Sequence, residues 1–521
     1  MVKKHGTFIT VGEEQTYLLG LDAGNTVIKA VLFDQDGRQV AMQALDGQTA
    51  TPAPGHVERD LGELWQNAGQ VIRGCIEEAG ISARQIAGVG CAGHGNGLYA
   101  LDKSGAPLIG IQSLDTRAAE LAEDLSETHG SDLHKICLQK PWPSQTPVLL
   151  AWVKRHQPEI YDRIGTVLLC KDFITHQLTG IKVSDISDMS GCGLTRMPAC
   201  RYDAELMRLY GLQDALSMLP ALVEPAEIAG HVTAAAAAQT GLIEGTPVIG
   251  GYFDVISSAL GSGVCRAGEA SIIAGTWSVN QVFSPEPVLD SSVFMASGFA
   301  PGRFVNIDSS ATSAVNLEWY VRELVERGAH VDDPFGQCNN LVAEVTPAPD
   351  DPICQPFLYG SGQGAQFRGG YFGLAGWHGE GHLLRALFEG VVFEHRRHIE
   401  VLRGAGLDFD TAVLSGGGSR SPHWPQIFAD CLDRKIRVSE AKETGALGAA
   451  IGVAVAVGLA EDYESAVARM TRTKAEFTPN PLMRRHYDQR YALYSELNAT
   501  LQPLWARLGA MQTGQCDENG S

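Results

Sequence analysis

The sequence predicts an α/β protein with two domains that face each other across a cleft. The chain has 521 residues, which is more than a single hydrophobic core usually supports. Residues 17–33 form an apolar strand–turn–strand pattern around a Gly-rich turn, and residues 270–279 open a similar pattern about 250 residues later. Two similar openings indicate two related lobes, and the join between them falls near residues 254–263.

The composition is that of an ordinary globular protein. Hydrophobic residues make up 44% of the chain and charged residues 19%, and neither a disordered nor a fibrous class fits these values. The formal net charge is −20 and the pI is about 5.2. A surface this acidic repels phosphate backbones and anionic lipid, so we expect no nucleic-acid and no membrane partner. An anionic nucleotide would need a metal ion or backbone N–H groups in order to bind.

Cysteine usage and the first residues indicate a cytoplasmic location. The eleven cysteines are scattered and form no CxxC pair, unlike a disulfide framework. No apolar stretch follows the lysines at the N-terminus, so we expect no signal peptide. The longest apolar run, residues 449–456, is too short to cross a bilayer. The polar residues 1–15 and 511–521 are expected to be flexible tails.

The first Gly-rich turn is suited to phosphate. Asp22 ends the first predicted strand, and Gly24, Asn25 and Thr26 follow it. Consecutive backbone N–H groups in a tight turn make an anion-binding concavity, and a carboxylate beside them can hold a hydrated Mg²⁺ ion. On this stretch alone, an ordinary hairpin with polar turn residues is the better explanation.

The last third of the chain alternates helices and strands. Residues 379–403 carry apolar side chains at helical spacing. Residues 411–415 are predicted to form a strand that runs into three glycines at 416–418. A helix of small residues is predicted at 447–457, and small side chains permit close approach to another helix or to a ligand.

Six segments carry a family resemblance when they are taken together. In chain order they are DAGNT at 22–26 with a lysine at 29, GCAGHGNGL at 90–98, SLDTR at 113–117, KDFITHQLTG at 171–180, GGYFD at 250–254, and GGYFGL at 369–374 with the residues at 382–389. In this order they resemble the motifs of the FGGY family of carbohydrate kinases, over roughly residues 17–459. Each motif alone is weak or moderate, and the six in order are specific.

The resemblance implies the architecture and the division of labour. We expect two actin-like (ribonuclease H-like) domains, each a mixed sheet flanked by helices, with a cleft between them. Residues 16–258 are expected to bind the sugar and to carry the first phosphate loop. Residues 259–505 are expected to bind the nucleotide.

Asp254 is the predicted catalytic residue. Phosphoryl transfer to an alcohol needs a group that accepts the hydroxyl proton and directs the oxygen at the γ-phosphorus. The alternative is that Asp254 caps a helix over residues 255–260. The two roles are compatible, because a helix N-terminus would also keep the carboxylate ionised.

By resemblance, ATP and Mg²⁺ bind between the lobes, with Asp22 as the metal ligand. The residues expected at the nucleotide are Asp22, Gly24, Asn25, Thr26, Lys29, Gly275, Thr276, Gly416, Gly417, Gly418, Ser421 and Glu443. A lone Gly-Thr pair or a Gly triplet would otherwise be only a turn or a flexible loop. The residues expected at the sugar are His94, Asn96, Asp115, Arg117 and Asp254, with Trp142, Asp185 and Asp188 as weaker candidates.

Two departures from the glycerol kinases bear on the substrate. Gly95-Asn96 stand where those enzymes carry Arg-Glu, and Ser113-Leu114 stand where they carry a Trp. The chain looks closer to the kinases of L-xylulose and 3-keto-L-gulonate. The resemblance therefore implies an ATP-dependent kinase of a ketopentose or related sugar, and by the same resemblance a homodimer.

Two alternatives stay open. One is a kinase of a polyol, either erythritol or glycerol. The other, from a different class, is a non-catalytic actin-like binding or regulatory protein. A DNA-binding regulator would normally bring a helix-turn-helix and basic residues, and neither is evident in this acidic chain.

Overall fold

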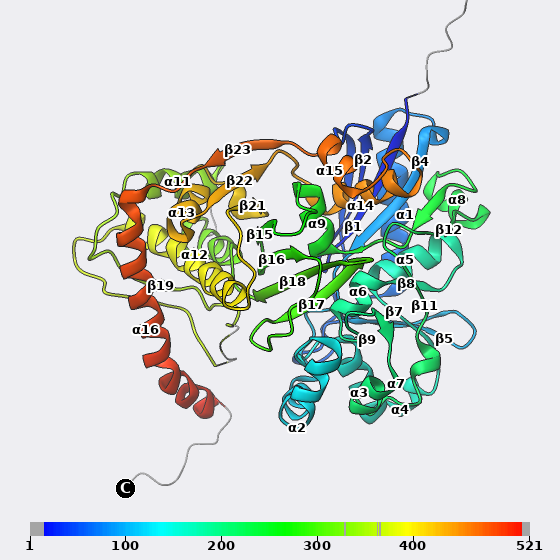
Figure 1. The fold of residues 1–521 in the computed structure, drawn as a ribbon, viewed down its shortest axis with the longest axis horizontal. Helices are drawn as coiled ribbons and strands as arrows, with labels where there is room; N and C mark the ends of the chain where they lie inside the picture. Colours follow the sequence, from blue (N-terminus) through cyan, green and yellow to red (C-terminus); the bar gives the residue numbers. More distant parts are fainter. Residues whose placement is uncertain (1–14, 328–329, 362, 364–365, 513–521) are drawn as a thin grey trace, which may run out of the picture.

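The computed structural model describes residues 15–327, 330–361, 363 and 366–512. Within these residues the protein has two lobes, each built on a seven-stranded mixed sheet flanked by helices (Figure 1). The predicted flexible tails, 1–15 and 511–521, lie outside the described residues except for residues 15, 511 and 512. The last two belong to the C-terminal helix α16 (Pro481–Gln512).

The first sheet is built around the predicted hairpin of residues 17–33, which is confirmed. In spatial order its strands are β12 (Ile228–His231), β13 (Pro247–Ile249), β4 (Ile86–Gly93), β1 (Tyr17–Ala23), β2 (Val27–Asp34) and β3 (Gln39–Asp46), with β14 (Tyr252–Phe253) also paired to β4. Strand β1 runs antiparallel to β2 and parallel to β4. Leu19 and Leu21 pack in one core cluster and Leu18 in another, because successive side chains of a strand point to opposite faces.

The second sheet repeats this arrangement. In spatial order its strands are β17 (Met295–Ala300), β18 (Arg303–Ser310), β16 (Ser278–Ser284), β15 (Ala270–Ala274), β21 (Thr411–Ser415), β22 (Lys435–Ser439) and β23 (Thr473–Phe477). Strand β15 runs antiparallel to β16 and parallel to β21, as β1 does to β2 and β4. The prediction of two related lobes is therefore confirmed, as is the predicted strand at 411–415.

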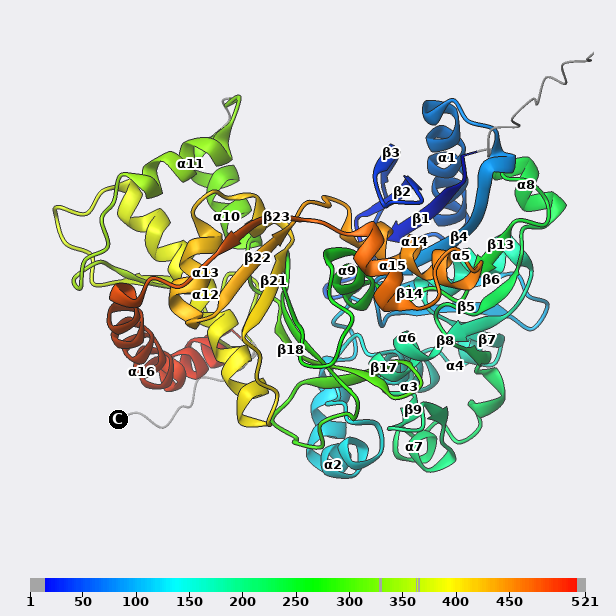
Figure 2. The same cartoon turned by 45° about the horizontal axis from the view of Figure 1, so that its top comes forward.

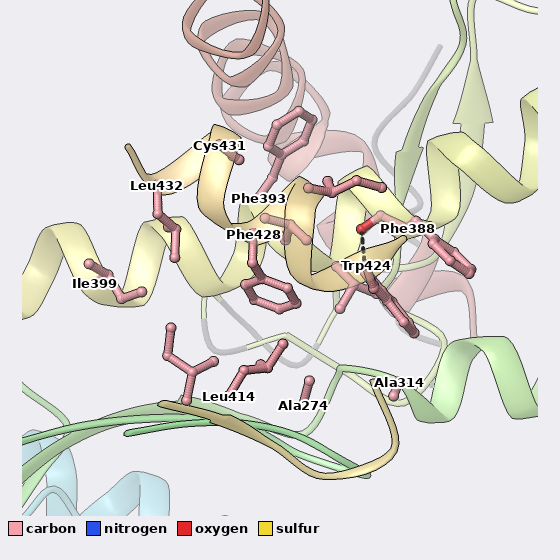
Figure 3. Packing of buried hydrophobic residues seen from close by; sticks show 14 of the residues in the cluster. Ala274, Ala314, Phe388, Phe393, Ile399, Leu414, Trp424, Phe428, Cys431 and Leu432 are labelled. Atoms are coloured by element: carbon pink, nitrogen blue, oxygen red, sulfur yellow. Dashed lines mark hydrogen bonds between the residues drawn. The ribbon is translucent and has the colours of Figure 1, made fainter. Parts of the chain in front are cut away.

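Helices cover the outer face of each sheet. On the first sheet these are α1 (Leu61–Ala79) and α5 (Cys170–Thr179), and on the second α12 (Glu380–Gly404) and α13 (Trp424–Leu432). Helix α12 agrees with the predicted helix at 379–403 to within one residue at each end. Figure 3 shows Phe388 of α12 against Trp424 of α13; their rings stack at 4.2 Å, and the indole N–H donates to the Phe388 carbonyl oxygen at 3.0 Å.

Two helices lie between the sheets, α9 (Asp254–Ser262) and α14 (Thr444–Ala456). Helix α14 comes from the second half of the chain, yet it packs against β1 and β4 of the first sheet (Figure 2). A Cβ atom on Gly20 would collide with the Ala446 carbonyl oxygen, and one on Gly448 would collide with that of Ser257 in α9. The predicted small-residue helix thus begins three residues earlier than expected, and its small residues serve close packing on a sheet and on a helix.

The remaining elements decorate the two lobes. The first lobe also has β5 (Leu98–Asp102), β6 (Pro107–Ile111), α2 (Ala119–Cys137), α3 (Thr146–His156), α4 (Pro158–Tyr161), β7 (Ile164–Leu168), β8 (Val183–Asp185), α6 (Ile186–Gly191), β9 (Thr195–Arg196), β10 (Arg201–Tyr202), α7 (Ala204–Leu209), β11 (Ala221–Val223) and α8 (Ala234–Thr240). The second also has α10 (Val315–Tyr320), α11 (Pro334–Ala343), β19 (Ile353–Gln355), β20 (Gly370–Phe372), η4 (Gly417–Arg420) and α15 (Tyr463–Met470).

The described helices and cysteines bear on the expected absence of membrane spans and of disulfides. Among the described helices, none combines the length and the apolar character needed to cross a bilayer. The apolar run at 449–456 lies inside α14, between the sheets. The ten cysteines of the described residues are all free thiols, and nine of them are buried.

Candidate active site

A cavity of about 370 Å³ lies where the two lobes meet, and it gathers the turns that the sequence singled out. The turn between β1 and β2 enters from the first lobe with residues 24–26. The turn between β15 and β16 enters from the second lobe with residues 275–277. Asp254, at the start of α9, lines the same cavity. A larger hollow of about 430 Å³ lies near α2, α3 and α7 and contains none of the predicted site residues.

Asp254 is the first residue of α9, directly after β14, and Phe253 rather than Asp254 occupies the helix N-cap position. The pKa of Asp254 is raised to about 8: burial raises it most, the nearby carboxylate of Asp22 also raises it, and the Val255 backbone N–H opposes both. The helix N-terminus therefore does not keep the pKa of this carboxyl low, as the sequence led us to expect. Loss of hydration outweighs the helix terminus, and the pKa of Asp254 lies well above its ordinary value.

Asp22 is the penultimate residue of β1 and lies against the start of α14, where a Cβ atom on Gly445 would lie 2.5 Å from its Oδ2. The pKa of Asp22 is raised to about 6: burial raises it most, the charge of Lys29 lowers it, and the charge of Glu443 raises it. Lys29 is the partner of Asp22 in the β1–β2 register, and its Nζ lies 2.7 Å from Glu443 Oε2. Lys29 and Glu443 are thus bonded to each other, and neither is among the cavity-lining residues.

The two turns are held in different ways. In the first turn Gly24 N donates to Val27 O at 3.0 Å, and Asn25 Nδ2 donates to Ser113 Oγ at 2.9 Å. In the second turn Gly275 N donates to the Trp277 carbonyl oxygen at 3.3 Å. Thr26 and Thr276 are both exposed at the cavity. Each lobe therefore presents one threonine at a glycine-containing turn.

The predicted glycine turn at 416–418 follows β21 and lies against the end of β15, beside the second turn. Gly416 has a φ of +82°, and a Cβ atom there would lie 2.7 Å from the Ala274 carbonyl oxygen. A Cβ atom on Gly418 would lie 2.8 Å from the Ala274 Cβ atom. Ser421 donates to Asn339 Oδ1 at 2.6 Å and accepts from the Trp424 N–H at 3.1 Å, so its hydroxyl is used at the start of α13.

Besides Asp254, two of the predicted sugar-binding residues, His94 and Asn96, line the cavity. Both ring nitrogens of His94 have partners, Nε2 with the Tyr99 hydroxyl at 2.8 Å and Nδ1 with the Gly95 carbonyl oxygen at 3.4 Å. Burial lowers the pKa of His94 to about 4, so its ring is neutral. Asn96 is held at a φ of 65°, and its buried Oδ1 has no hydrogen-bond partner, which leaves an acceptor free for a hydroxyl group.

The structure does not bring Asp115 and Arg117 to the cavity. Their buried side chains pair with each other at 2.8 Å, and Arg117 also pairs with Glu58 at 2.7 Å. Asp115 Oδ2 also accepts from the Val57 N–H at 2.6 Å. Both charges hold the segment at 57–58 against the loop after β6, and the expected sugar contacts of the two residues stay predictions.

Of the three weaker candidates for the sugar site, one lines the cavity and two do not. Trp142 lines the cavity, and its ring meets that of Trp277 from the other lobe at 5.9 Å between centroids. Asp185 and Asp188 do not line it and are buried around Lys171. Sequence reasoning missed further lining residues, which are Ser113, Leu114, Phe253, Val255, Ser258, Ile273, Val279, Phe294, Met295, Ile307 and Ser309.

Comparisons with known proteins agree with this architecture. The model of the FGGY family of carbohydrate kinases, N-terminal domain, matches residues 17–261, and that of the C-terminal domain matches residues 270–457. An Escherichia coli protein named L-xylulose/3-keto-L-gulonate kinase is 35% identical over 94% of this chain and 98% of its own length. A Pasteurella multocida protein named probable L-xylulose kinase is 34% identical over 94% and 99%. The crystal structure of xylulose kinase from Rhodospirillum rubrum superposes with a TM-score of 0.85 and 30% identity, over 94% of this chain and all of that one.

Proposed function

Because the chain belongs to the FGGY family of carbohydrate kinases, we propose that this ATP-dependent sugar kinase acts on a ketopentose or related sugar of the L-xylulose or 3-keto-L-gulonate type. The relatives named for these sugars are similar over nearly the whole chain, which favours this class over erythritol and glycerol. The observation that carries the proposed mechanism is the position of Asp254 in a cavity between two glycine-containing turns, one from each lobe.

Asp254 would act on the sugar hydroxyl. In the transfer, the hydroxyl oxygen forms a bond to the γ-phosphorus, the bond from that phosphorus to the bridging oxygen breaks, and ADP leaves. The hydroxyl proton passes to the Asp254 carboxylate, and the raised pKa of that carboxyl makes it a better proton acceptor once it is ionised. Asn96 Oδ1 would accept from a second sugar hydroxyl and so orient the ring or chain.

The two turns would hold the phosphates of ATP. We assign the backbone and hydroxyl groups of Thr26 and Thr276 to this role, with Gly24 and Gly275 allowing close approach. The glycine turn at 416–418 would accept the adenosine. Lys29, Glu443 and Ser421 would act only indirectly, since their polar atoms already have protein partners.

The donor set near the turns fits Mg²⁺. Proteins bind Mg²⁺ through one or two carboxylates together with substrate phosphates, and Asp22 would supply the carboxylate. No group of three or more His, Cys, Asp or Glu side chains in the described residues could hold a metal ion alone. When bound, the ion would neutralise charge on the phosphates.

The division of labour along the chain remains a proposal. Residues 16–258 would carry the sugar site and the first phosphate turn, and residues 259–505 would carry the nucleotide site. Helix α14 belongs to the second segment by sequence, although it packs on the first sheet. A homodimer and a cytoplasmic location stay predictions from the sequence.

The cavity favours a neutral sugar. None of the described residues that line it is Lys or Arg, and Asp254 contributes a carboxyl group. A sugar acid such as 3-keto-L-gulonate brings a carboxylate, which proteins usually hold with Arg or Lys. We therefore expect L-xylulose to be the better substrate of the two.

The test is ADP release from Mg-ATP with a panel that contains L-xylulose, 3-keto-L-gulonate, other ketopentoses, erythritol and glycerol. We expect turnover with one ketose, preferably L-xylulose, and its loss in Asp254→Asn. Turnover that is unchanged in the variant would refute the role of Asp254. No turnover with any member would bring forward a non-catalytic binding or regulatory protein.

A further inference from the structure

A buried cluster of charges lies beside the site without lining its cavity. Lys171 of α5 is completely buried, and its Nζ contacts Asp172, Asp185 Oδ2 at 2.6 Å and Asp188 Oδ2 at 3.6 Å. Three carboxyl groups thus surround one ammonium group. Burying charges in this way costs free energy and does not by itself argue for stability. The contacts that the cluster makes with its surroundings therefore indicate what it does.

A chain of hydrogen bonds leads from this cluster to the backbone next to Asp254. Asp185 caps α6, and its Oδ1 accepts from the Ser187 N–H at 2.7 Å and from the Ser187 hydroxyl. The Ser187 Oγ accepts in turn from the Phe253 N–H at 3.1 Å. Phe253 is the residue before Asp254 and occupies the N-cap position of α9. The Ser187 hydroxyl therefore holds the backbone amide of the residue that directly precedes the proposed base.

The same short helix is bonded to the second lobe. The Ser187 carbonyl oxygen accepts from Ser297 Oγ of β17 at 2.6 Å. One turn later, the Ser190 Oγ accepts from the Gly298 N–H at 3.0 Å. Helix α6 is thus fixed between the start of α9 on one side and strand β17 on the other.

We infer that Ser187 is the positioning residue for Asp254, with its hydroxyl fixing the Phe253 amide and its carbonyl oxygen tying the same residue to Ser297 of the other lobe. Small displacements of a reacting group reduce rates strongly, because the attacking and accepting atoms must be aligned. The inference rests on the proposed role of Asp254 as the base. Lys171 and Asp185 act through Ser187, since they hold its hydroxyl in place.

The test compares Ser187→Ala with Ser184→Ala. Ser184 is also completely buried, three residues earlier in β8, and its hydroxyl has no hydrogen-bond partner, so it is a matched control. For Ser187→Ala we expect kcat to fall about 10- to 100-fold while KM for ATP changes less than about twofold, because alignment and not nucleotide binding is lost. Ser184→Ala should keep the parent kcat. Equal kcat values in the two variants would overturn the inference.

A second readout does not depend on knowing the sugar. Hydrogen exchange, followed by mass spectrometry on peptides that contain Phe253, should speed up at least about tenfold at this amide in Ser187→Ala and not in Ser184→Ala, because the amide has lost its acceptor. Unchanged exchange would overturn the inference. If the parent phosphorylates no sugar, the proposed function fails, and the exchange result still decides whether Ser187 holds the Phe253 amide.

Ser297→Ala tests the link to the other lobe, because it removes the hydroxyl that donates to the Ser187 carbonyl oxygen and leaves the bond between the Ser187 hydroxyl and the Phe253 N–H in place. We expect a smaller loss of kcat than in Ser187→Ala, and no further loss when the two are combined, since both act through one residue. Losses that multiply in the double variant would show independent effects and would overturn the link between the lobes.

Discussion

Lys29 and Glu443 form an ion pair across 414 residues of the chain, with Nζ and Oε2 2.7 Å apart. Lys29 lies on β2 of the first sheet, and Glu443 directly precedes α14. Apart from burial, these two side chains have the largest effects on the pKa of Asp22, and they act in opposite directions. The pair therefore links the electrostatics of the proposed Mg²⁺ ligand to the packing of α14 on the first sheet.

Removing one member of this pair should be worse than removing both. Lys29→Met leaves Glu443 beside Asp22 without its cation, so the pKa of Asp22 should rise and KM for ATP should increase. In the double variant with Glu443→Gln we expect much of the loss to be recovered, with a coupling free energy of about 0.5–3 kcal/mol. ATP kinetics and urea unfolding on all four proteins measure this, and strictly additive losses would argue against the coupling.

The raised pKa of Asp254 predicts an alkaline activity profile. The base must be ionised to accept a proton, so kcat/KM for ATP at saturating sugar should rise with pH through about 8 and level off above it. Protonation of Asp22 should reduce the rate further below about pH 6. A flat profile from pH 6.5 to 9 would contradict the assignment.

The same pKa predicts that Asp254→Asn stabilises the fold. In the unfolded chain Asp254 is ionised above its ordinary pKa of 3.8, whereas in the folded protein it holds its proton up to about 8. Folding is therefore opposed increasingly as the pH rises from about 4 to about 8, and asparagine escapes this penalty. The Tm of the variant should exceed that of the parent at pH 8, and the difference should shrink toward pH 4.

The exposed Asp132, whose pKa is lowered by its partner Lys135, provides the control for this measurement. Asp132→Asn should give no gain in Tm at any pH. If the gain in Tm of Asp254→Asn over the parent grew as the pH fell, the raised pKa of Asp254 would be refuted.

Alanine variants at Arg117 and Asn96 should differ in effect, the first mainly on the free energy of unfolding and the second mainly on the KM for the sugar. Arg117→Ala leaves the buried carboxylate of Asp115 unpaired, which typically costs about 3–5 kcal/mol of unfolding free energy. The KM for the sugar should change little in the folded fraction. Asn96→Ala removes the free acceptor at the cavity, so the sugar KM should rise, and the loss of an asparagine at a positive φ should cost about 1–2 kcal/mol of unfolding free energy, less than Arg117→Ala. A sugar KM that rises in Arg117→Ala and not in Asn96→Ala would support Arg117 as a sugar ligand.

The contact between α9 and α14 should tolerate no side chain at Gly448. A methyl group there would collide with the Ser257 carbonyl oxygen, so Gly448→Ala should lower the free energy of unfolding by about 1–3 kcal/mol or more. Gly404 ends α12 with open space around its Cβ position, so Gly404→Ala should be neutral or stabilise by up to about 1 kcal/mol. Urea unfolding measures both, and equal effects would discount the contact.

How far the sequence predicts this molecule depends on the distance between interacting residues. The strands, the paired turns and the long helix α12 are set by local patterns, so the turns that carry Thr26 and Thr276 could be located from the sequence. The ion pairs of Asp115 and Arg117 could not be predicted, because no local pattern reveals that Glu58 approaches Arg117 from an earlier loop. Phe294 precedes β17 and Ser309 lies in β18, and neither belongs to a recognisable motif. Their place at the cavity could not be predicted, because it depends on how the two lobes meet.

The position of α14 has a consequence for the order in which the chain acquires its structure during synthesis. The strands of the first sheet leave the ribosome early, but the helix that covers their second face ends only at Ala456. Until then Leu18, Val31 and their neighbours lack the partners that bury them in the finished protein. The first lobe is therefore not an autonomous folding unit, and the nascent chain presents an apolar surface for most of its translation, as substrates of chaperones do.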